Sequence, residues 1–372
     1  MEKMNVRILV MAILLLACGS NDTVPVPTPS TKPYFPPNGT GALWGTVTPA
    51  SLGWNEAAIP DLKTFLTNTN SRALIVLKDG RIVIELYLNT QINSTAAFTE
   101  TSTWYWASAG KTLTSSLVGI ASGQGKISLD AKTSDYLGIG WTKLTSLQES
   151  KITVKNQLTM TTGLDDYSDA GSTGNKDCTD PACLTFKADP GARWAYHNAP
   201  YTLLDGVIAA GTGQPLTSFF NTQLRDRIGM DGAYLKIDYN NVFFSSPRSM
   251  ARFGLLLLNE GKWNDVFIIP STYVTLMKTT SQNFNLSYGY LTWLNGKTSS
   301  MAPGSQTVFP VEICANAPND MFAAMGKNGQ LINMVPSKGL VVIRMGDVPD
   351  NFLVPFNFQN DLWAKLNAVI TN

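Results

Sequence analysis

Strand-like segments lie near both ends of this 372-residue chain, and segments with helical spacing fill its middle. Residues Asp79 and Gly80 form a pair that favours a tight hairpin turn between two apolar, β-branched runs. The order strands, helices, strands predicts an α+β domain in which both chain ends complete one antiparallel sheet. The segments expected to be strands are 72–78, 81–87, 321–325, 330–335 and 339–345, with a turn at 336–339.

The middle of the chain and its last stretch carry apolar residues at helical spacing. These helices would pack on the sheet and build an inserted, mainly helical lobe, and a cleft between sheet and lobe is the expected place for a site. Gly-rich loops such as 169–175 separate them. The expected helices cover 108–123, 152–161, 200–211, 217–228, 246–260 and 358–370.

The N-terminal residues have the pattern of a secretion signal. Basic residues precede an apolar run over 8–16, which is long enough for a signal-peptide core and too short to span a bilayer. The run ends in Leu-Leu-Ala-Cys, which resembles the lipobox of bacterial lipoproteins. We therefore expect residues 1–17 to be removed and Cys18 to carry lipid; an ordinary signal peptide with an incidental cysteine is the alternative.

The segment after Cys18 has a composition that cannot pack a core. Residues 18–41 are rich in Pro, Thr and Ser, which predicts an extended tether before a domain over 42–372. The expected location is outside the cytoplasm, on a bacterial membrane. Gly19 after the cysteine favours the outer membrane or the periplasmic side.

Composition limits the partners. The chain has 28 basic and 27 acidic residues, so it has no basic field that would attract nucleic acid. Hydrophobic residues make up 44% of the chain, enough for a substantial core. No nucleic acid partner is expected, and no pattern indicates an oligomeric state.

The cysteines predict a disulfide rather than a metal site. Cys178 and Cys183 are close enough in sequence to bridge in an oxidising compartment. With one histidine in the chain and Cys314 as the remaining thiol, metal binding by this pair is disfavoured. Cys314 is expected to be a small buried apolar residue. No metal and no cofactor are expected.

Ser108 and Lys111 form the one Ser-x-x-Lys in the chain and share a face at the start of a predicted helix. A serine hydroxyl is a poor nucleophile until a base removes its proton, and a lysine can be that base when burial or nearby positive charge lowers its pKa. The helix N-terminus adds a backbone N–H for an oxyanion. The pair therefore predicts a nucleophile, a base and one half of an oxyanion hole. The alternative is that Ser108 and Lys111 only lie on a solvent-exposed helix face.

Tyr196 and Asn198 lie in a loop that enters a helix. We expect Tyr196 to pass a proton between Ser108 and a leaving group once a nearby ammonium makes its phenol more acidic. Asn198 can hydrogen-bond Lys111 and a substrate carbonyl. Two further Tyr-x-Asn matches are expected to be structural, since Tyr87 falls on a strand and Tyr239 in a polar turn.

With these motifs the chain resembles the penicillin-recognising serine hydrolases, which include class C β-lactamases, D,D-peptidases, related esterases and 6-aminohexanoate-oligomer hydrolases. They carry Ser-x-x-Lys, then Tyr-x-Asn or Tyr-x-Ser, then a strand like Lys-Thr-Gly. The resemblance spans about residues 55–370 and implies a β-lactamase/transpeptidase-like fold. It also extends to the flanking segments 158–164, 190–194, 201–204 and 288–293.

The third motif departs from the family pattern, because residues 323–330 contain no Lys-Thr-Gly. Either Lys327-Asn328-Gly329 replaces it, or Ala324-Met325-Gly326 lies on the strand and the Lys327 N–H completes the oxyanion hole. We favour the second alternative, which resembles Gly-x-His-Gly-Gln of the aminohexanoate hydrolases. Without Lys-Thr-Gly, recognition of β-lactams is disfavoured. The expected substrate-binding residues are Tyr167, on a loop that borders the cleft in this family, His197 as a cleft-wall residue, Gly326, Asn328 and Gly329.

The sequence thus predicts a lipid-anchored serine hydrolase of the bacterial envelope. It would act through an acyl-enzyme on a small ester or amide, as a carboxylesterase or amidase. One alternative is a D,D-peptidase or β-lactamase acting on peptidoglycan or β-lactams. The other is an inactive module that binds peptidoglycan fragments.

Overall fold

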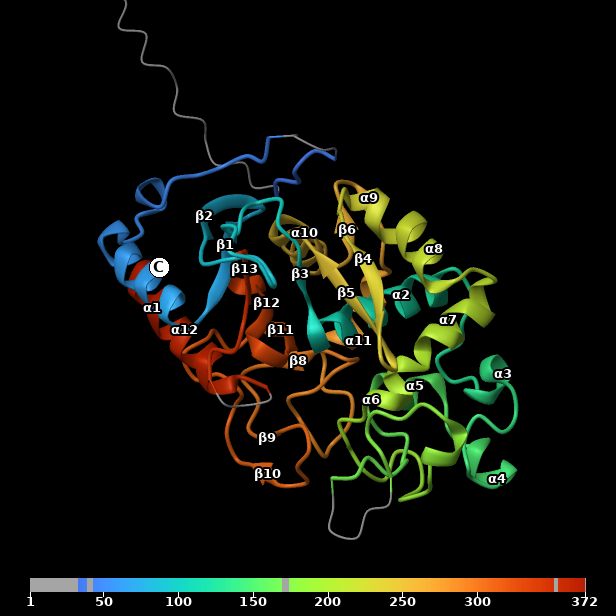
Figure 1. Ribbon diagram of the computed structural model, residues 1–372. Helices are drawn as coiled ribbons and strands as arrows, with labels where there is room; N and C mark the ends of the chain where they lie inside the picture. Colours follow the sequence, from blue (N-terminus) through green and yellow to red (C-terminus); the bar gives the residue numbers. More distant parts are fainter. Residues whose placement is uncertain (1–32, 39–42, 169–173, 351–353, 372) are drawn as a thin grey trace, which may run out of the picture. The chain divides into compact units, whose positions relative to one another are not determined.

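A six-stranded sheet forms the centre of the computed structural model, which describes residues 33–38, 43–168, 174–350 and 354–371 (Figure 1). The strand order is β2-β1-β13-β12-β11-β8, and each neighbouring pair is antiparallel. Both ends of the chain contribute to it, so the predicted α+β class and the shared sheet are confirmed. The strands are β1 (Ser71–Lys78), β2 (Arg81–Tyr87), β8 (Trp293–Leu294), β11 (Phe322–Gly326), β12 (Gln330–Val335) and β13 (Leu340–Gly346).

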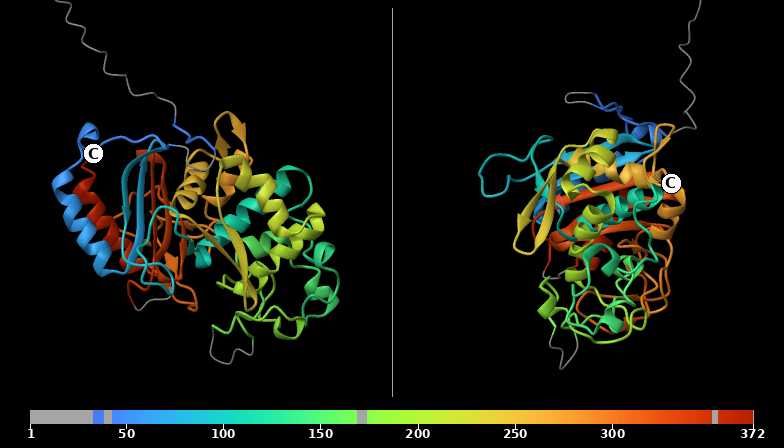
Figure 2. Two further views of the ribbon diagram at one scale, coloured as in Figure 1. Left: turned by 45° about the horizontal axis from the view of Figure 1, so that its top comes forward. Right: turned by 90° about the vertical axis from the view of Figure 1, so that its right-hand side faces the viewer.

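Helices cover both faces of this sheet (Figure 2). On one face α1 (Ile59–Asn68) packs beside α12 (Phe356–Val369), and on the other α10 (Pro247–Leu258) crosses β1, β12 and β13. Gly254 lets α10 approach closely, because a Cβ there would lie 2.6 Å from Val341 and 2.8 Å from Ile332. Strands β11, β12 and β13 are buried along their whole length between these two layers, whereas the edge strand β2 is mostly half-buried.

The inserted part of the chain builds the lobe beside the sheet. Its central helix is α2 (Gly110–Gly123), which is buried along nearly its whole length. The other helices of the chain between β2 and β8 are α3 (Ser134–Leu137), α4 (Ser146–Glu149), α5 (Val154–Leu158), α6 (Asn198–Thr202), α7 (Leu204–Thr212), α8 (Leu216–Phe220), α9 (Asp226–Ile228) and α11 (Ser271–Met277).

Short strands and turns complete the described residues. A three-stranded sheet has the order β3-β5-β4, and two two-stranded pairs are β6 with β7 and β9 with β10. These strands are β3 (Trp104–Tyr105), β4 (Ala233–Ile237), β5 (Asn240–Ser245), β6 (Lys262–Trp263), β7 (Val266–Phe267), β9 (Ser300–Met301) and β10 (Val308–Phe309). Single helical turns are η1 (Ala50–Leu52), η2 (Glu56–Ala58), η3 (Ala107–Ala109), η4 (Pro181–Cys183), the π turn η5 (Asn221–Arg225), η6 (Lys327–Gly329) and η7 (Pro336–Lys338).

Three expected helices differ from the observed ones. The helix expected over 200–211 is interrupted at Leu203, between α6 and α7. The helix expected over 152–161 ends at Leu158, because Met160 has a φ of 59° that a helix cannot contain. The helix expected over 217–228 is divided by the π turn η5. The β4–β5 hairpin was not expected, since most of β4 is exposed and lacks the apolar alternation that marks a half-buried strand.

The end of the expected tether belongs to the folded body. Tyr34 N donates to Asp79 O at 2.9 Å, and the Arg252 guanidinium donates to Pro36 O at 3.3 Å and Pro37 O at 2.7 Å. Residues 33–38 are therefore docked, and this corrects the boundary drawn at residue 42. Cys18, residues 1–17 and most of 18–41 lie outside the described residues. Within the described ranges, no helix combines the length and apolarity needed to cross a membrane.

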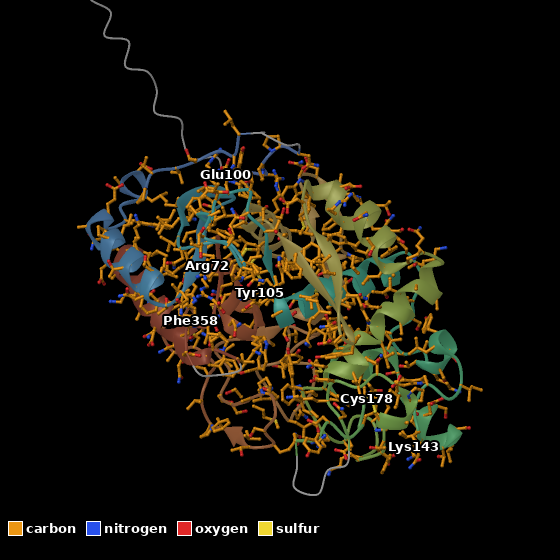
Figure 3. All side chains as sticks on the ribbon, in the orientation of Figure 1. Arg72, Glu100, Tyr105, Lys143, Cys178 and Phe358 are labelled. Atoms are coloured by element: carbon orange, nitrogen blue, oxygen red, sulfur yellow. A yellow bond between two sulfur atoms is a disulfide. The ribbon has the colours of Figure 1, made fainter. Side chains whose placement is uncertain are left out.

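A disulfide joins Cys178 to Cys183, and Cys314 is buried. Figure 3 labels Cys178, which lies in the inserted lobe. Burial raises the pKa of the Cys314 thiol to about 12, so this cysteine is an inert thiol at neutral pH.

Replacing Gly254 by valine should destabilise the protein. The added side chain would overlap Val341 and Ile332 and force α10 away from the sheet, at a cost of about 1–3 kcal/mol in the free energy of unfolding. Urea denaturation of the purified chain measures this. Ala210→Val, an exposed position in α7, is the matched control and should change stability by less than about 0.5 kcal/mol.

Candidate active site

Ser108 sits in η3, the turn that leads directly into α2. The preceding residue, Ala107, has a φ of 47°, a left-handed conformation that costs a non-glycine residue free energy. The turn contacts strand β11, so Ser108 lies where the buried helix meets the edge of the main sheet. The hydroxyl is partly exposed and faces a cleft.

Lys111 lies one helical turn after Ser108 and contacts it directly. Its Nζ is 3.0 Å from Ser108 Oγ, and the residue is only 2% exposed. Lys111 Nζ lies over the aromatic rings of Tyr196 and Tyr201, at 4.9 and 4.3 Å from their centroids. Burial lowers the pKa of Lys111 to about 7, against a smaller opposing effect of Asp177. A large fraction of this amine is neutral at physiological pH, so it can accept the serine proton.

Tyr196 is the second proton-handling group beside Ser108. Its phenol shares a hydrogen bond with Ser108, and its ring stacks on Trp293 with centroids 5.9 Å apart. The expected acidification of the phenol is wrong: burial raises the pKa of Tyr196 well above its ordinary value. Tyr196 therefore stays protonated and can act as a donor that relays a proton.

Asn198 begins α6 and makes different contacts from those expected. Its Nδ2 donates to Asp177 Oδ1 at 2.8 Å and to the Tyr239 hydroxyl oxygen at 3.3 Å. The hydrogen bond expected between Asn198 and Lys111 is not formed among the described contacts. The Asn198 Oδ1 is buried without a hydrogen-bond partner in the described structure.

Two residues of the site were not predicted. Tyr239 donates to Asp177 Oδ1 at 2.9 Å and, like Asp177, lines the cleft. The Tyr-x-Asn spacing at Tyr239 was visible in the sequence, and its place in a turn between β4 and β5 agrees with the prediction. Nothing local indicated that this turn reaches the cleft.

The cleft holds about 520 Å³ between the sheet edge and the inserted lobe. It joins the Ser108 turn and α2 to the loop before α6, the β4–β5 hairpin and the end of β11. The lining residues are Ala107, Ser108, Lys111, Asp166, Tyr167, Ser168, Lys176, Asp177, Tyr196, Asn198, Tyr239, Asn240, Val242, Pro303, Gly304, Lys327 and Val354.

The end of β11 touches the backbone of the Ser108 turn. A Cβ at Gly326 would lie 2.5 Å from Trp106 O and 3.0 Å from Ser108 N, so no side chain fits there. Lys327 follows in the next turn and lines the cleft with an exposed side chain. The structure thus has Ala324–Gly326 on the strand and Lys327–Gly329 in a turn, as in the second of the two alignments considered above.

Asn328 and Gly329, expected as substrate contacts, support this turn and do not line the cleft. Both have left-handed backbones, with φ of 64° and 73°. Asn328 Nδ2 donates to the Tyr105 hydroxyl at 2.7 Å. Arg344 is fully buried and donates to Asn328 O, to Gly329 O at 3.2 Å and to Thr69 O at 2.7 Å. Gly326 likewise has a packing role against the Ser108 turn.

His197 does not form a cleft wall, which corrects the prediction. It is 2% exposed, and burial lowers its pKa to about 4, so the imidazole is neutral. Its backbone is extended, with φ −114° and ψ 117°. Successive side chains of an extended segment point to opposite sides, so with Tyr196 and Asn198 facing the cleft, His197 faces the interior.

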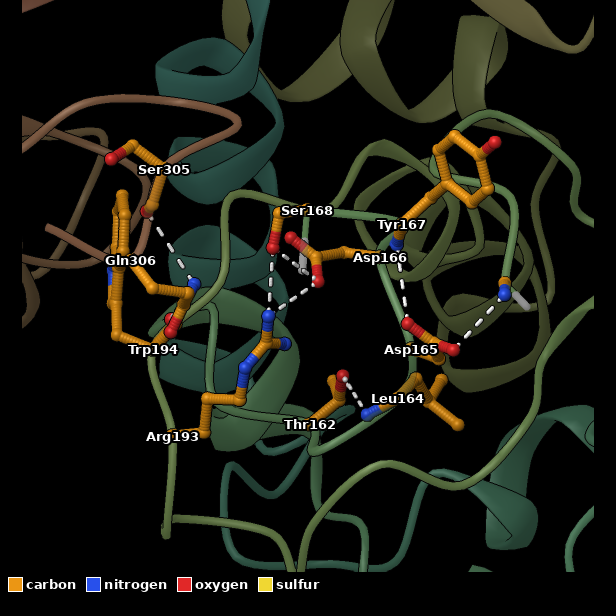
Figure 4. Close-up of polar contacts among 11 residues, drawn as sticks. Thr162, Leu164, Asp165, Asp166, Tyr167, Ser168, Arg193, Trp194, Ser305 and Gln306 are labelled. Atoms are coloured by element: carbon orange, nitrogen blue, oxygen red, sulfur yellow. Dashed lines mark hydrogen bonds and ion pairs between the residues drawn. The ribbon is translucent and has the colours of Figure 1, made fainter. Parts of the chain in front are cut away.

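Tyr167 lines the cleft as expected and is 67% exposed. Its φ of 63° is left-handed, and its N–H lies 3.3 Å from Asp165 Oδ1. On the other side Arg193 forms a buried ion pair with Asp166 at 2.7 Å and also donates to Ser168. Figure 4 shows the Tyr167 ring pointing away from this ion pair. These contacts fix the backbone of the loop that carries the exposed Tyr167 side chain.

The donor set does not favour a metal. Among the described residues, no group of three or more His, Cys, Asp and Glu side chains is placed to hold a metal ion. The polar groups that line the cleft are hydroxyls, amides, lysines and the two carboxylates of Asp166 and Asp177.

Comparison with known families agrees with this geometry. Residues 64–349 match the model of the Beta-lactamase family. The chain belongs to this family. The resemblance noted in the sequence is therefore confirmed, although no curated protein matches the chain significantly.

Solved structures show the same β-lactamase/transpeptidase-like fold at low sequence identity. A provisionally named 6-aminohexanoate-dimer hydrolase from Bacillus anthracis is 18% identical, with a TM-score of 0.66 over 87% of each chain. A penicillin-binding protein from Bacillus halodurans is 16% identical, with a TM-score of 0.61 over 82% of this chain and 99% of its own. EstCE1, a hydrolase with promiscuous acyltransferase activity, is 12% identical, with a TM-score of 0.62 over 86% of this chain and 99% of its own.

Reaction of this β-lactamase-family protein with a fluorophosphonate should depend on pH with a midpoint near 7. A neutral Lys111 amine can accept the Ser108 proton and a protonated one cannot, so labelling should be lost as pH falls below that value and level off above it. Intact-mass measurement of the adduct over time gives the rate at each pH. A midpoint near 10, the ordinary value for lysine, would contradict the assigned burial effect.

Gly326→Ala should slow the same labelling by about 100-fold. The new Cβ would push the end of β11 away from the Ser108 turn, and a displacement of about 1 Å costs a site that much. Gly110→Ala is the matched control on the other side of Ser108, because a Cβ there meets no atom within 4 Å. Equal labelling rates in the two variants would show that the contact at Gly326 does not shape the site.

Proposed function

We propose that this protein is a serine hydrolase that acts through an acyl-enzyme on small esters or amides. Ser108 is the nucleophile, Lys111 the general base and Tyr196 the relay to the leaving group. The observation that carries the proposal is the 3.0 Å contact between Ser108 Oγ and the amine of a buried Lys111. A lysine whose pKa is lowered to about 7 can take the hydroxyl proton at physiological pH.

The reaction divides into two half-reactions. In the first, Ser108 Oγ attacks the carbonyl carbon while Lys111 takes the proton, and the backbone N–H groups of Ser108 and Lys327 hold the oxyanion. The proton then passes through Tyr196 to the leaving alcohol or amine, and the bond to that group breaks. In the second, water attacks the acyl-enzyme, its proton follows the reverse route, and Ser108 leaves with its hydroxyl restored.

The contacts of Asn198 favour a simple ester over a peptide or penicillin. Its two N–H groups are directed at Asp177 and Tyr239, so neither is free for a second carbonyl of the substrate. The absence of Lys-Thr-Gly removes another group that would hold a substrate carboxylate. The structures of similar fold include a provisionally named 6-aminohexanoate-dimer hydrolase and a hydrolase with promiscuous acyltransferase activity alongside a penicillin-binding protein, which is compatible with this choice.

The proposed location is the bacterial envelope, with the chain anchored through lipid on Cys18. The Leu-Leu-Ala-Cys sequence supports the anchor. The disulfide between Cys178 and Cys183 is compatible with an oxidising compartment outside the cytoplasm.

Three variants should divide the roles on p-nitrophenyl acetate. Ser108→Ala should abolish turnover and fluorophosphonate labelling, and Lys111→Ala should lower kcat/KM by about 10²–10⁴-fold because the base is lost. Lys327→Ala is the matched control: it removes an exposed charge but keeps the backbone N–H, so turnover of an uncharged ester should stay near the wild-type rate. The turnover of p-nitrophenyl acetate and the extent of fluorophosphonate labelling are measured on the purified full-length chain in detergent.

Other outcomes point to the alternatives. Stable acylation by a penicillin, together with cleavage of D-Ala-D-Ala that Ser108→Ala abolishes, would replace the esterase by a D,D-peptidase. A folded wild type with no adduct and no turnover, but saturable binding of peptidoglycan fragments, would indicate a binding module. Equal losses in Lys111→Ala and Lys327→Ala would show that the assigned roles are wrong.

A further inference from the structure

Asp177 is a cleft residue that the proposed reaction does not use. One oxygen, Oδ1, accepts from Asn198 Nδ2 at 2.8 Å and from the Tyr239 hydroxyl at 2.9 Å. An ionised carboxylate can only accept, so it determines which atom of the Asn198 carboxamide points toward it. The amide nitrogen faces Asp177, and the amide oxygen is left buried without a partner in the described structure.

Asp177 lines the same cleft as Lys111 and acts on it electrostatically. The groups that face the Lys111 amine are the Ser108 hydroxyl, the Tyr196 and Tyr201 rings and, through space, Asp177. Both tyrosines stay neutral because burial raises their pKa values. Asp177 is therefore the acidic group that opposes the effect of burial on the lysine and favours its protonated form.

The backbone around Asp177 is fixed on both sides. Asn175 Oδ1 accepts from the Asp177 N–H at 3.0 Å, and Lys176 O accepts from the Ala199 N–H at the start of α6, also at 3.0 Å. The next residue, Cys178, is joined by the disulfide to Cys183. These contacts hold the Asp177 backbone beside the start of α6.

We propose that Asp177 is a positioning residue of the active site, which orients the Asn198 carboxamide and holds a negative charge in the cleft that Lys111 also lines. This rests on the proposed hydrolase function. Asp177 does not touch the reacting atoms; it acts through Asn198, Tyr239 and the lysine. Its two effects separate chemically, because one depends on charge and the other on an acceptor oxygen.

Two substitutions distinguish these effects. Asp177→Asn removes the charge but keeps an acceptor oxygen, so the acid limb of the kcat/KM profile for p-nitrophenyl acetate should move to lower pH by about 0.5–1 unit, with a smaller loss of kcat than in Asp177→Ala. Asp177→Ala should shift the limb equally and lower kcat by a further 10-fold or so, because Asn198 and Tyr239 lose their acceptor. Asp177→Glu should restore most of the wild-type profile.

The matched control is Asp180→Asn, which removes the same charge from an exposed position in the disulfide loop that directly follows Asp177. The pH profile of kcat/KM for Asp180→Asn should coincide with that of the wild type. An acid limb that stays in place in Asp177→Asn, or that shifts as much in Asp180→Asn, would overturn the proposal. If circular dichroism shows that Asp177→Ala is unfolded, the acid limb of Asp177→Asn still tests the effect of the charge on Lys111.

A second measurement separates this proposal from the proposed function. NMR titration of ¹⁵N-lysine-labelled protein follows Lys111 without any turnover. A downward shift of its titration midpoint in Asp177→Asn supports the positioning role even if the wild type hydrolyses no ester, in which case the hydrolase proposal alone fails. An active wild type whose Lys111 titrates identically in Asp177→Asn means that Asp177 does not position the site.

Discussion

Burial of the Lys111 amine against Ser108 is the interaction on which the candidate site depends. A charged ammonium is costly to remove from water, so a lysine in the middle of the body is stable there mainly as a neutral amine. Helix α2 fixes this position, since it is buried along nearly its whole length and cannot turn its lysine toward solvent. The packing that stabilises the fold thereby also generates the base.

The second half of the site comes from the sheet. Strand β11 ends in a glycine that lets its backbone meet the Ser108 turn, and the following turn brings Lys327 into the same cleft. A buried arginine below that turn satisfies its carbonyls. Rigid secondary structure on both sides therefore holds the two backbone segments together, which suits an oxyanion site that must be preorganised.

The features that were predicted correctly are those determined by interactions between residues close in sequence. The β-branched runs around Asp79 and Gly80 gave the hairpin, and helical spacing after Ser108 gave the helix that carries Lys111. The acidity of Tyr196 was mispredicted because burial, a tertiary property, raises its pKa by more than the hydrogen bond with Ser108 lowers it.

The roles of Asp177 and Tyr239 could not be read from the sequence. They meet Asn198 only because the disulfide loop and the β4–β5 hairpin converge on the start of α6, and no spacing rule expresses that convergence. His197 was misplaced for a related reason, since the direction of a side chain depends on backbone angles that its identity does not reveal.

The contacts of Arg344 have a consequence for when the site can form. Its guanidinium connects Thr69, near the beginning of the folded body, to the Asn328 and Gly329 carbonyls near its end. The turn that carries Lys327 is thus complete only when early and late parts of the chain have folded together. A partly synthesised chain holds Ser108 and Lys111 without this turn, so under the proposed function it is expected to be inactive until the last strand docks.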